Sequence, residues 1–224
     1  DRKENASKVE GFNTSDVMYL ITPDRFANGD FSNDDVEYMY ERPNRNNNRG
    51  IHGGDIQGII NHLDYIKDLG FTTVWLNPVT ENNMKKSSYH GYSTTDYYKV
   101  DPRFGTNELF KELSYKSKEM GIKLVMDMIP NHCGSEHWFF KDPPMEDWFN
   151  NQSGFKQTSH RRQTVQDIYA SEIDKREHAD GWFVETMPDL NQKNKKMSKY
   201  LIQNTLWWIE YAGLSGIRVD TYPY

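Results

Sequence analysis

The sequence predicts an α/β protein whose parallel sheet is the first half, strands 1–4, of a (β/α)8 TIM barrel, with an insertion after strand 3. Three observations support this fold class. An amphipathic stretch, a glycine and a short apolar run follow one another three times along the chain. An apolar run at 17–21 precedes the first copy and supplies an opening strand. The second and third glycines lie farther apart than the first and second, which leaves room for the insertion.

Each repeat is typical of a helix followed by a strand. In the first, apolar residues from Ile56 to Leu69 recur at spacings of three and four, as on one face of a helix. Glycine ends helices in a left-handed conformation, and β-branched runs favour strands. The three copies are helix 56–69, Gly70 and strand 73–77; helix 109–120, Gly121 and strand 122–127; helix 197–209, Gly213 and strand 216–220.

The insertion follows from the spacing of these glycines. Gly70 and Gly121 are 51 residues apart, whereas Gly121 and Gly213 are 92 apart. The extra residues are rich in Trp and Phe, which argues against disorder and favours a small inserted domain. The predicted domains are barrel strands 1–3 over 1–130, the insertion over 131–187, and the third helix with strand 4 over 188–224.

The count of strands leaves one alternative fold. Four strands are half of the eight that a (β/α)8 barrel needs, so we expect the remaining strands outside this chain. A doubly wound open sheet would also give alternating helices and strands. The chain lacks the glycine-rich phosphate loop typical of that fold, which ranks it lower.

Composition narrows the classes of partner. The net charge of −6 argues against nucleic acid and anionic membranes, which attract basic patches. No apolar stretch approaches the length of a membrane span. The single Cys133 excludes an internal disulfide. Tyr and Trp are frequent, and their flat faces with polar edges suit a hydroxylated ligand as well as a protein core.

Candidate site residues lie where the predicted strands end. In a barrel, functional side chains gather at the carboxyl ends of strands, which here gives Asn77, Asp127 and Asp220. Arg218 lies two residues before Asp220, so both side chains face the same side of the strand. A cation beside a carboxylate stabilises its charge and orientation, as a carboxylate nucleophile requires. For an arbitrary Arg-x-Asp, however, a structural ion pair is the more frequent role.

Four segments in the right chain order resemble the signatures of glycoside hydrolase family 13, the α-amylase family. They are 91–98 with 101–105 after strand 2, the D-x-x-x-N-H segment 127–132, the segment 187–191 in the insertion, and 216–220 in strand 4. Each alone is weak, but four in the right order, across a glycine-spaced half-barrel with an insertion after strand 3, make a match over nearly the whole chain. The resemblance implies a catalytic barrel whose insertion is the domain B of that family.

The resemblance also implies roles for individual residues. Asp220 matches the nucleophile of retaining glycosidases, and Arg218 matches its electrostatic partner. Asp127 matches the carboxylate that holds this arginine. Three further residues match side chains that bind the sugar at the cleavage point, although each alone would be assigned to packing: His90, Tyr92 and His132. Asn131 matches a position that ligates calcium in many α-amylases.

An Asx-rich loop at 28–34 is a candidate calcium site. It concentrates side-chain oxygens, the ligands that Ca²⁺ prefers, although an ordinary turn has similar composition. The segment 23–30 resembles the neopullulanase and cyclomaltodextrinase branch of the family, in which this loop binds calcium. The implied ligands of a structural Ca²⁺ are Asn28, Asp30, Asn33, Asp34, Gly53 and Asp55.

The implied activity is retaining hydrolysis of α-1,4-glucosidic bonds in pullulan, cyclodextrins or maltooligosaccharides, through a covalent glycosyl-Asp220 intermediate. A transglycosylase of the same family, a non-catalytic glucan-binding relative and an unrelated α/β binding protein are the alternatives. The family's acid/base glutamate follows strand 5, so we expect the chain alone to be inactive.

The resemblance has consequences for the whole protein as well. We expect it to continue past Tyr224, to carry an N-terminal β-sandwich and to be able to form a homodimer. Asp189 stands where this branch usually has lysine, a variant that fits the starch-utilisation neopullulanases of Bacteroides-like bacteria. That comparison implies a periplasmic location.

Overall fold

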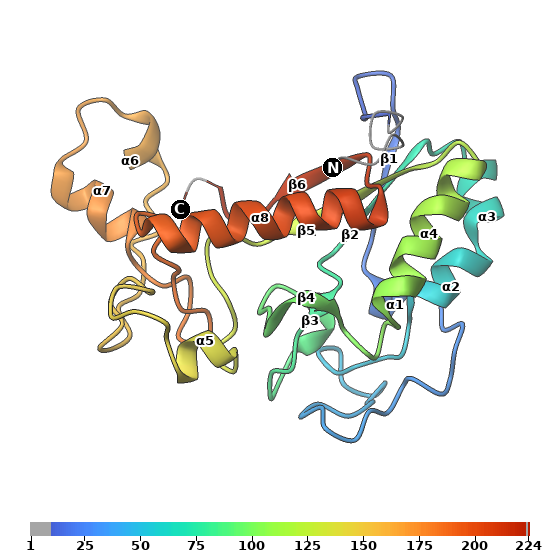
Figure 1. Ribbon diagram of the computed structural model, residues 1–224, viewed down its shortest axis with the longest axis horizontal. Coiled ribbons are helices and arrows are strands. Elements are labelled where there is room, and N and C mark those ends of the chain that lie inside the picture. The colour runs from blue at the N-terminus through green and yellow to red at the C-terminus, as the bar shows by residue number, and fades with distance from the viewer. Residues whose placement is uncertain (1–9, 223) are drawn as a thin grey trace.

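The sheet at the centre of the chain has four parallel strands in the spatial order β1-β2-β5-β6 (Figure 1). The computed structural model describes residues 10–222 and residue 224. The four strands are Met18–Ile21 (β1), Thr73–Leu76 (β2), Lys123–Met128 (β5) and Gly216–Val219 (β6). Their spatial order follows the chain order, as in a (β/α)8 barrel, whereas a doubly wound sheet reverses its order. The first half of a barrel is therefore the observed fold.

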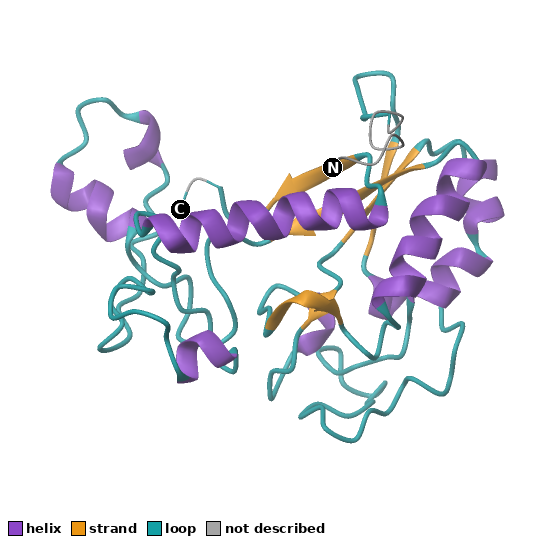
Figure 2. Ribbon diagram, viewed as in Figure 1, coloured by secondary structure: helices purple, strands orange, loops and turns teal. Residues whose placement is uncertain are grey.

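Helices connect the strands as the repeat predicts (Figure 2). The connecting helices are Ile56–Asn61 (α2), Leu63–Asp68 (α3), Asn107–Glu119 (α4) and Lys195–Ala212 (α8). The first predicted helix is divided at His62, whose backbone φ of −118° and ψ of 17° leave the helical region. Its ring is held by the carbonyl of Gly58 at 2.7 Å and packs edge-on against Phe26, which stabilises the break.

The glycines that follow these helices have the left-handed backbone that the sequence predicts. The φ angles of Gly70, Gly121 and Gly213 are +84°, +76° and +63°. A residue with a Cβ is strained in this region, so glycine is the residue that turns each helix back toward the next strand. Side-chain oxygens cap the first turn of three of these helices: Asp55 accepts from the amide of Gly58, Thr106 from that of Leu109, and Asn194 from the amides of the first turn of α8.

The main core lies between the sheet and these helices and contains apolar residues from all three repeats. Trp208 of α8 is fully buried there, and Trp207 beside it is half-buried. Ile202 and Leu206, apolar residues of the same helix, are 60% and 51% exposed. The buried stripe of α8 instead follows another line: Met197, Leu201, Asn204, Trp208 and Ala212.

The segment between β5 and α8 folds around a second apolar cluster that includes Phe139, Trp148 and Phe149. Its helices are Trp138–Lys141 (α5), Gln163–Gln166 (α6) and Glu172–Ala179 (α7). In Figure 1 it lies at the end of the molecule that holds the start of α8. The aromatic residues thus form a packed core, although the predicted boundaries at 131 and 187 stay a prediction.

Two shorter pieces complete the fold. A short helix, Pro23–Phe26 (α1), follows β1, and an antiparallel pair follows β2: Thr80–Glu81 (β3) and Asp96–Val100 (β4). A single 3₁₀ turn at Ser88–His90 lies between β3 and β4. None of the described helices combines the length and the apolar character needed to cross a membrane.

Candidate active site

The carboxyl ends of β5 and β6 bring Asp127 and Arg218 into direct register. The Nη1 atom of Arg218 donates to both carboxylate oxygens of Asp127 at 3.1 Å. The same nitrogen also donates to Oδ1 of Asp220, two residues along the chain. One guanidinium therefore holds two carboxylates at the mouth of the half-barrel, as the sequence predicts for Arg218 and Asp220.

Asp127 is the buried member of this group, with 1% of its surface exposed. Besides Arg218, the indole Nε1 of Trp75 donates to it at 3.0 Å and the hydroxyl of Tyr92 at 3.2 Å. Burial raises the pKa of Asp127 to about 6, although Arg218 and Trp75 act in the opposite direction. Its oxygens are fully engaged with protein donors, so its role in the site is to position Arg218.

Arg218 is held from two sides. Its guanidinium carbon lies 5.0 Å from the ring centroid of Trp75, a cation–π contact. Burial by itself would lower the pKa of Arg218, but the hydrogen bonds and charges of Asp127 and Asp220 raise it. The guanidinium therefore stays protonated and its orientation is fixed by three neighbouring side chains.

Asp220 is the first residue after β6. Its amide donates to the carbonyl of Met128 at 2.8 Å, so its backbone still belongs to the sheet. The hydroxyl of Thr221 donates to Oδ2, and Arg218 donates to Oδ1. Thr221 has a φ of +54°, which is uncommon for a β-branched residue and turns the chain sharply after the carboxylate. Both oxygens of Asp220 are thus oriented while its side chain is still 15% exposed.

Two histidines accompany the carboxylate. Nδ1 of His90 accepts from the amide of Tyr92 at 2.9 Å, which leaves the proton of the neutral ring on Nε2. Burial lowers the pKa of His90, and the pKa of His132 falls to about 4 for the same reason. Nε2 of His132 donates to the carbonyl of Tyr92 at 3.1 Å, so any ligand hydroxyl at this point would share that proton.

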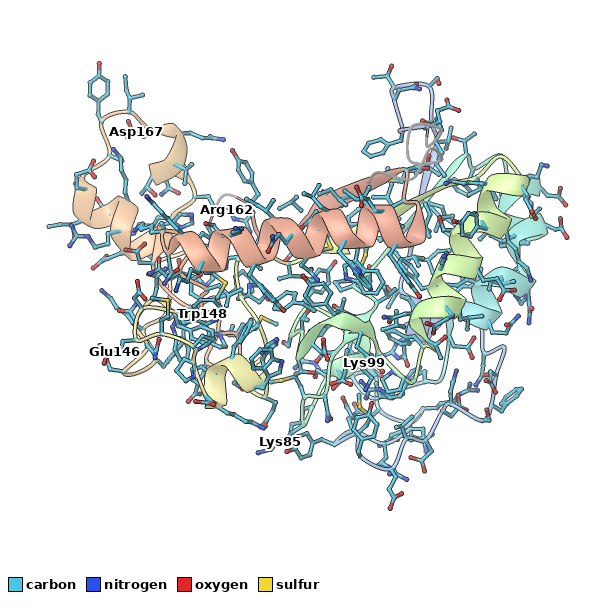
Figure 3. The ribbon with its side chains drawn as sticks, viewed as in Figure 1. Lys85, Lys99, Glu146, Trp148, Arg162 and Asp167 are labelled. Atoms are coloured by element: carbon cyan, nitrogen blue, oxygen red, sulfur yellow. The ribbon has the colours of Figure 1, made fainter. Side chains whose placement is uncertain are left out.

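These side chains surround a cavity of about 360 Å³. The insertion supplies part of its wall, and Arg162, labelled in Figure 3, reaches it from the segment before α6. The lining residues are His90, Tyr92, His132, Arg162, Phe183, Met187, Arg218, Asp220, Thr221, Tyr222 and Tyr224. The structure therefore gathers five of the six predicted catalytic and binding residues around one cavity, with Asp127 directly behind them.

Sequence reasoning missed several members of the site. Trp75 could have been found, because it lies two residues before Asn77 on the same face of β2; Asn77 itself does not line the cavity. Phe183, whose ring stacks against His132 with centroids 5.8 Å apart, comes from the insertion. No periodicity or motif in that segment distinguishes Phe183 or Arg162 from surface residues.

The Asx-rich loop is organised around Asp55, which starts α2. The Asp55 carboxylate accepts from the amides of Gly29, Asp30 and Gly58 at 2.6–3.1 Å. The Asp30 carboxylate accepts from the amide and the hydroxyl of Ser32 within its own turn. These hydrogen bonds fix the loop against the helix. Asp30 and Asp55 would have to share their oxygens with any ion.

The other predicted ligands form a closer group. Asp34 accepts at 2.7 Å from the Nδ2 of Asn28. A Cβ added to Gly53 would lie 2.5 Å from the Asp34 carboxylate. Burial raises the pKa of Asp34. The Oδ1 atoms of Asn28 and Asn33 are buried without a hydrogen-bond partner among the residues that the structure describes. Buried amide oxygens beside a carboxylate fit the oxygen ligands of Ca²⁺.

A second group of buried oxygens lies next to His132, which pairs with Asp189 in a β-bridge. Oδ1 of Asn131 and Oδ1 of Asp189 are both buried without a partner in the described part of the chain. Burial raises the pKa of Asp189 to about 8, and Asn150 donates to its other oxygen at 2.7 Å. No three His, Cys, Asp or Glu side chains in residues 10–222 and 224 gather as a metal site, so both groups depend on asparagine oxygens.

A parallel half-barrel with a guanidinium and two carboxylates at the carboxyl ends of its strands defines a (β/α)8-barrel protein with a polar site at its mouth. The family described as "Alpha amylase, catalytic domain" matches residues 20–224. The chain belongs to the α-amylase family.

Individual relatives support this family membership. The chain is 36% identical to a cyclomaltodextrinase of Thermoanaerobacter pseudethanolicus, covering 92% of this chain and 34% of the relative. It is 31% identical to neopullulanase 2 of Thermoactinomyces vulgaris, and the match covers 91% of this chain and 33% of that relative. An Anoxybacillus α-amylase structure superimposes with a TM-score of 0.76 at 36% identity, covering 92% of this chain and 41% of that one. The chain spans about a third of these two curated relatives.

Proposed function

We propose that the protein carrying this chain is a retaining glycoside hydrolase that cleaves α-1,4-glucosidic bonds of starch-derived glucans. The observation that carries the proposal is the arrangement of Asp220: both carboxylate oxygens are oriented by donors, and the side chain faces a cavity with two neutral histidines and Tyr92. Such a carboxylate can attack the anomeric carbon of a sugar while the glycosidic oxygen leaves, which forms the covalent glycosyl intermediate of retaining enzymes.

The neighbouring residues suit the remaining tasks. Nε2 of His90 keeps a proton that it can donate to a sugar hydroxyl, and the half-buried ring of Tyr92 offers an apolar face to a pyranose. Arg218 stabilises the charge of Asp220 before attack and after release of the sugar. Asp127 keeps Arg218 in place during both steps.

The acid/base is proposed to come from outside this chain. A retaining glycosidase needs a second carboxyl group about 5–5.5 Å from the nucleophile. Asp127 has the raised pKa of an acid, but its oxygens accept from Trp75, Tyr92 and Arg218 and are closed to solvent. We therefore expect the proton donor on the later strands of the barrel, and the isolated chain to be inactive.

The substrate class is supported by the relatives, among which are enzymes named cyclomaltodextrinase and neopullulanase. The decisive experiment incubates the full-length protein with γ-cyclodextrin and with pullulan and follows the first products by proton NMR. We expect the α-anomer to appear before mutarotation. An initial β-anomer would contradict a covalent intermediate, and an absence of products would favour the non-catalytic relative. Longer oligosaccharides formed from added maltose would favour the transglycosylase.

We further propose a structural Ca²⁺ in the Asx-rich loop. The unpartnered oxygens of Asn28 and Asn33, the Asp34 carboxylate and the carbonyl of Gly53 would hold it, with Asp30 and Asp55 at its edge. Because the ion would bind only the folded protein, it would stabilise by about 2.7 kcal/mol at a hundredfold excess over Kd.

Calcium removal tests this site. We expect EDTA to lower the Tm of the full-length wild type by about 5 °C or more, since 1 kcal/mol shifts a large domain by about 2–4 °C. Asp34→Ala should melt as the EDTA-treated wild type does, with or without calcium. Asp35→Ala, a neighbouring exposed carboxylate, is the matched control and should respond as wild type does. A calcium response that persists in Asp34→Ala would place the ion elsewhere, for example at Asn131 and Asp189.

The homodimer and the extracytoplasmic location that the resemblance implies stay predictions.

A further inference from the structure

A second hollow, of about 200 Å³, lies on another part of the surface. It is formed by the segment between α1 and α2, the β3–β4 pair and the start of the insertion. It shares no residue with the active-site cavity. In Figure 3, Lys85 and Lys99 lie on this side of the molecule, away from Arg162. The lining residues are Tyr40, Glu81, Asn83, Thr95, Asp96, Glu136, Trp138 and Lys141.

Two of these residues are large aromatics that remain exposed. Trp138 is 54% exposed and Tyr40 is 52% exposed, although each is held by the fold. The Trp138 ring packs on Phe139 with ring centroids 4.0 Å apart. The amide of Tyr40 donates to Oδ1 of Asn83 at 2.8 Å. Exposed aromatic rings on fixed backbone are the surfaces on which the apolar face of a ligand can stack.

Most charges around the hollow are paired with one another, while the carboxylate of Asp96 accepts from the amide of Tyr98 at 2.9 Å. Glu136 accepts from Lys141 at 2.8 Å and lies 3.3 Å from Lys85. Glu81 lies 2.9 Å from Lys99. A surface with this balance attracts neither anions nor cations over long range, yet it offers many hydrogen-bond donors and acceptors. Its chemistry therefore favours a neutral, hydroxylated ligand with a flat apolar face.

We propose that this hollow binds a segment of an α-glucan chain outside the active site, between the rings of Tyr40 and Trp138. The identity of the ligand rests on the proposed function, because a glucan is the neutral polyhydroxylated molecule that the protein would meet. The hollow is smaller than the 300–1,000 Å³ typical of a site that encloses a whole small molecule, so it suits part of a long chain. A polysaccharide bound here and at the Asp220 cavity together would dissociate more slowly, because each bound site holds the chain at a high effective concentration near the other.

The test measures retention of the full-length protein in native gels that contain amylopectin, in an Asp220→Asn background so that the polymer is not consumed. We expect Trp138→Ala and Tyr40→Ala each to weaken the apparent affinity about tenfold, or 1.4 kcal/mol. Tyr115→Ala is the matched control, because Tyr115 is 50% exposed but lies on α4. It should be retained as the parent is. Equal retention of all three variants would overturn the proposal.

Two further measurements separate this site from the active site and from folding. With Asp220 intact, Trp138→Ala should keep the kcat/KM of the wild type on maltotriose, because a short substrate does not reach the hollow. A matching loss on maltotriose would show that Trp138 serves the active site and would overturn the proposal. If loss of packing on Phe139 lowers the Tm of Trp138→Ala, the retention of Tyr40→Ala in the amylopectin gels tests the proposal in its place.

The two proposals can fail independently. Hydrolysis of cyclodextrin without any amylopectin retention would leave the proposed function and remove this site. If the protein hydrolyses no cyclodextrin but its retention by amylopectin depends on Trp138, this site would stand and the proposed function would be removed.

Discussion

Replacing Asp220 by asparagine in the full-length protein is expected to lower kcat on γ-cyclodextrin by about 10⁴-fold or more, the scale on which loss of a nucleophilic centre acts in other hydrolases. An amide oxygen is a poor nucleophile and cannot form the glycosyl ester. The substitution keeps the size of the side chain: the amide oxygen can still accept from Arg218, and the amide NH2 can donate to the hydroxyl oxygen of Thr221. We therefore expect little change in the urea midpoint.

The matched control is Asp68→Asn, an exposed aspartate at the end of α3. It removes one negative charge without touching the cavity and should keep the kcat of the wild type. Near-wild-type turnover in Asp220→Asn would contradict the assignment of Asp220 as the nucleophile. A comparable loss in both variants would point to net charge or folding as the cause.

Replacing Arg218 by methionine should reduce both turnover and stability. The variant keeps an apolar stem but leaves Asp127 and Asp220 without their shared cation. We expect kcat/KM to fall by roughly 10²-fold or more, because preorganised charge is lost next to the nucleophile. We expect unfolding to become easier by about 2 kcal/mol, which is less than for a fully buried pair because the side chain of Arg218 is 36% exposed.

The stability loss in Arg218→Met should depend on pH in a defined direction. The pKa of Asp127 is already raised to about 6 by burial, and Arg218 opposes that shift, so its removal raises the pKa further. Only the charged form of Asp127 is destabilised by losing the arginine. The loss in free energy of unfolding should therefore be largest at pH 8 and shrink as pH falls through 6, where Asp127 becomes neutral. Urea titrations at pH 8 and 5 measure this. Arg218→Lys, which keeps the charge, should lose less at pH 8, and an equal loss at both values would contradict the role of Asp127.

Much of the fold could be predicted because its repeats use local signals. Gly70, Gly121 and Gly213 each mark the end of a helix, since a left-handed residue is a requirement of the backbone itself. The strands that follow them are short apolar runs and were placed to within about a residue. Arg218 and Asp220 could be placed together for a similar reason, because the two-residue period of a strand fixes which side chains share a face.

The rest depends on contacts that no local pattern records. His62 divides a helix through its own ring contacts, and Asn204 occupies a buried position on α8 because it donates to the carbonyl of Tyr97 at 2.8 Å. Phe183 and Arg162 reach the cavity only because the insertion folds back over the strand ends. The hollow beside Trp138 joins three segments that are far apart in the sequence.

Helix α8 has a consequence for how the cavity can open. Its first turns pack into the aromatic cluster of the insertion through Met197 and Leu201, and its last turns pack under the sheet through Trp208 and Ala212. One unbroken rod of about 27 Å thus joins the aromatic cluster of the insertion to the core under the sheet. A swinging lid would require that rod to bend or undock. The position of the insertion relative to the sheet is accordingly set when the chain folds, and so is the gap that their side chains line.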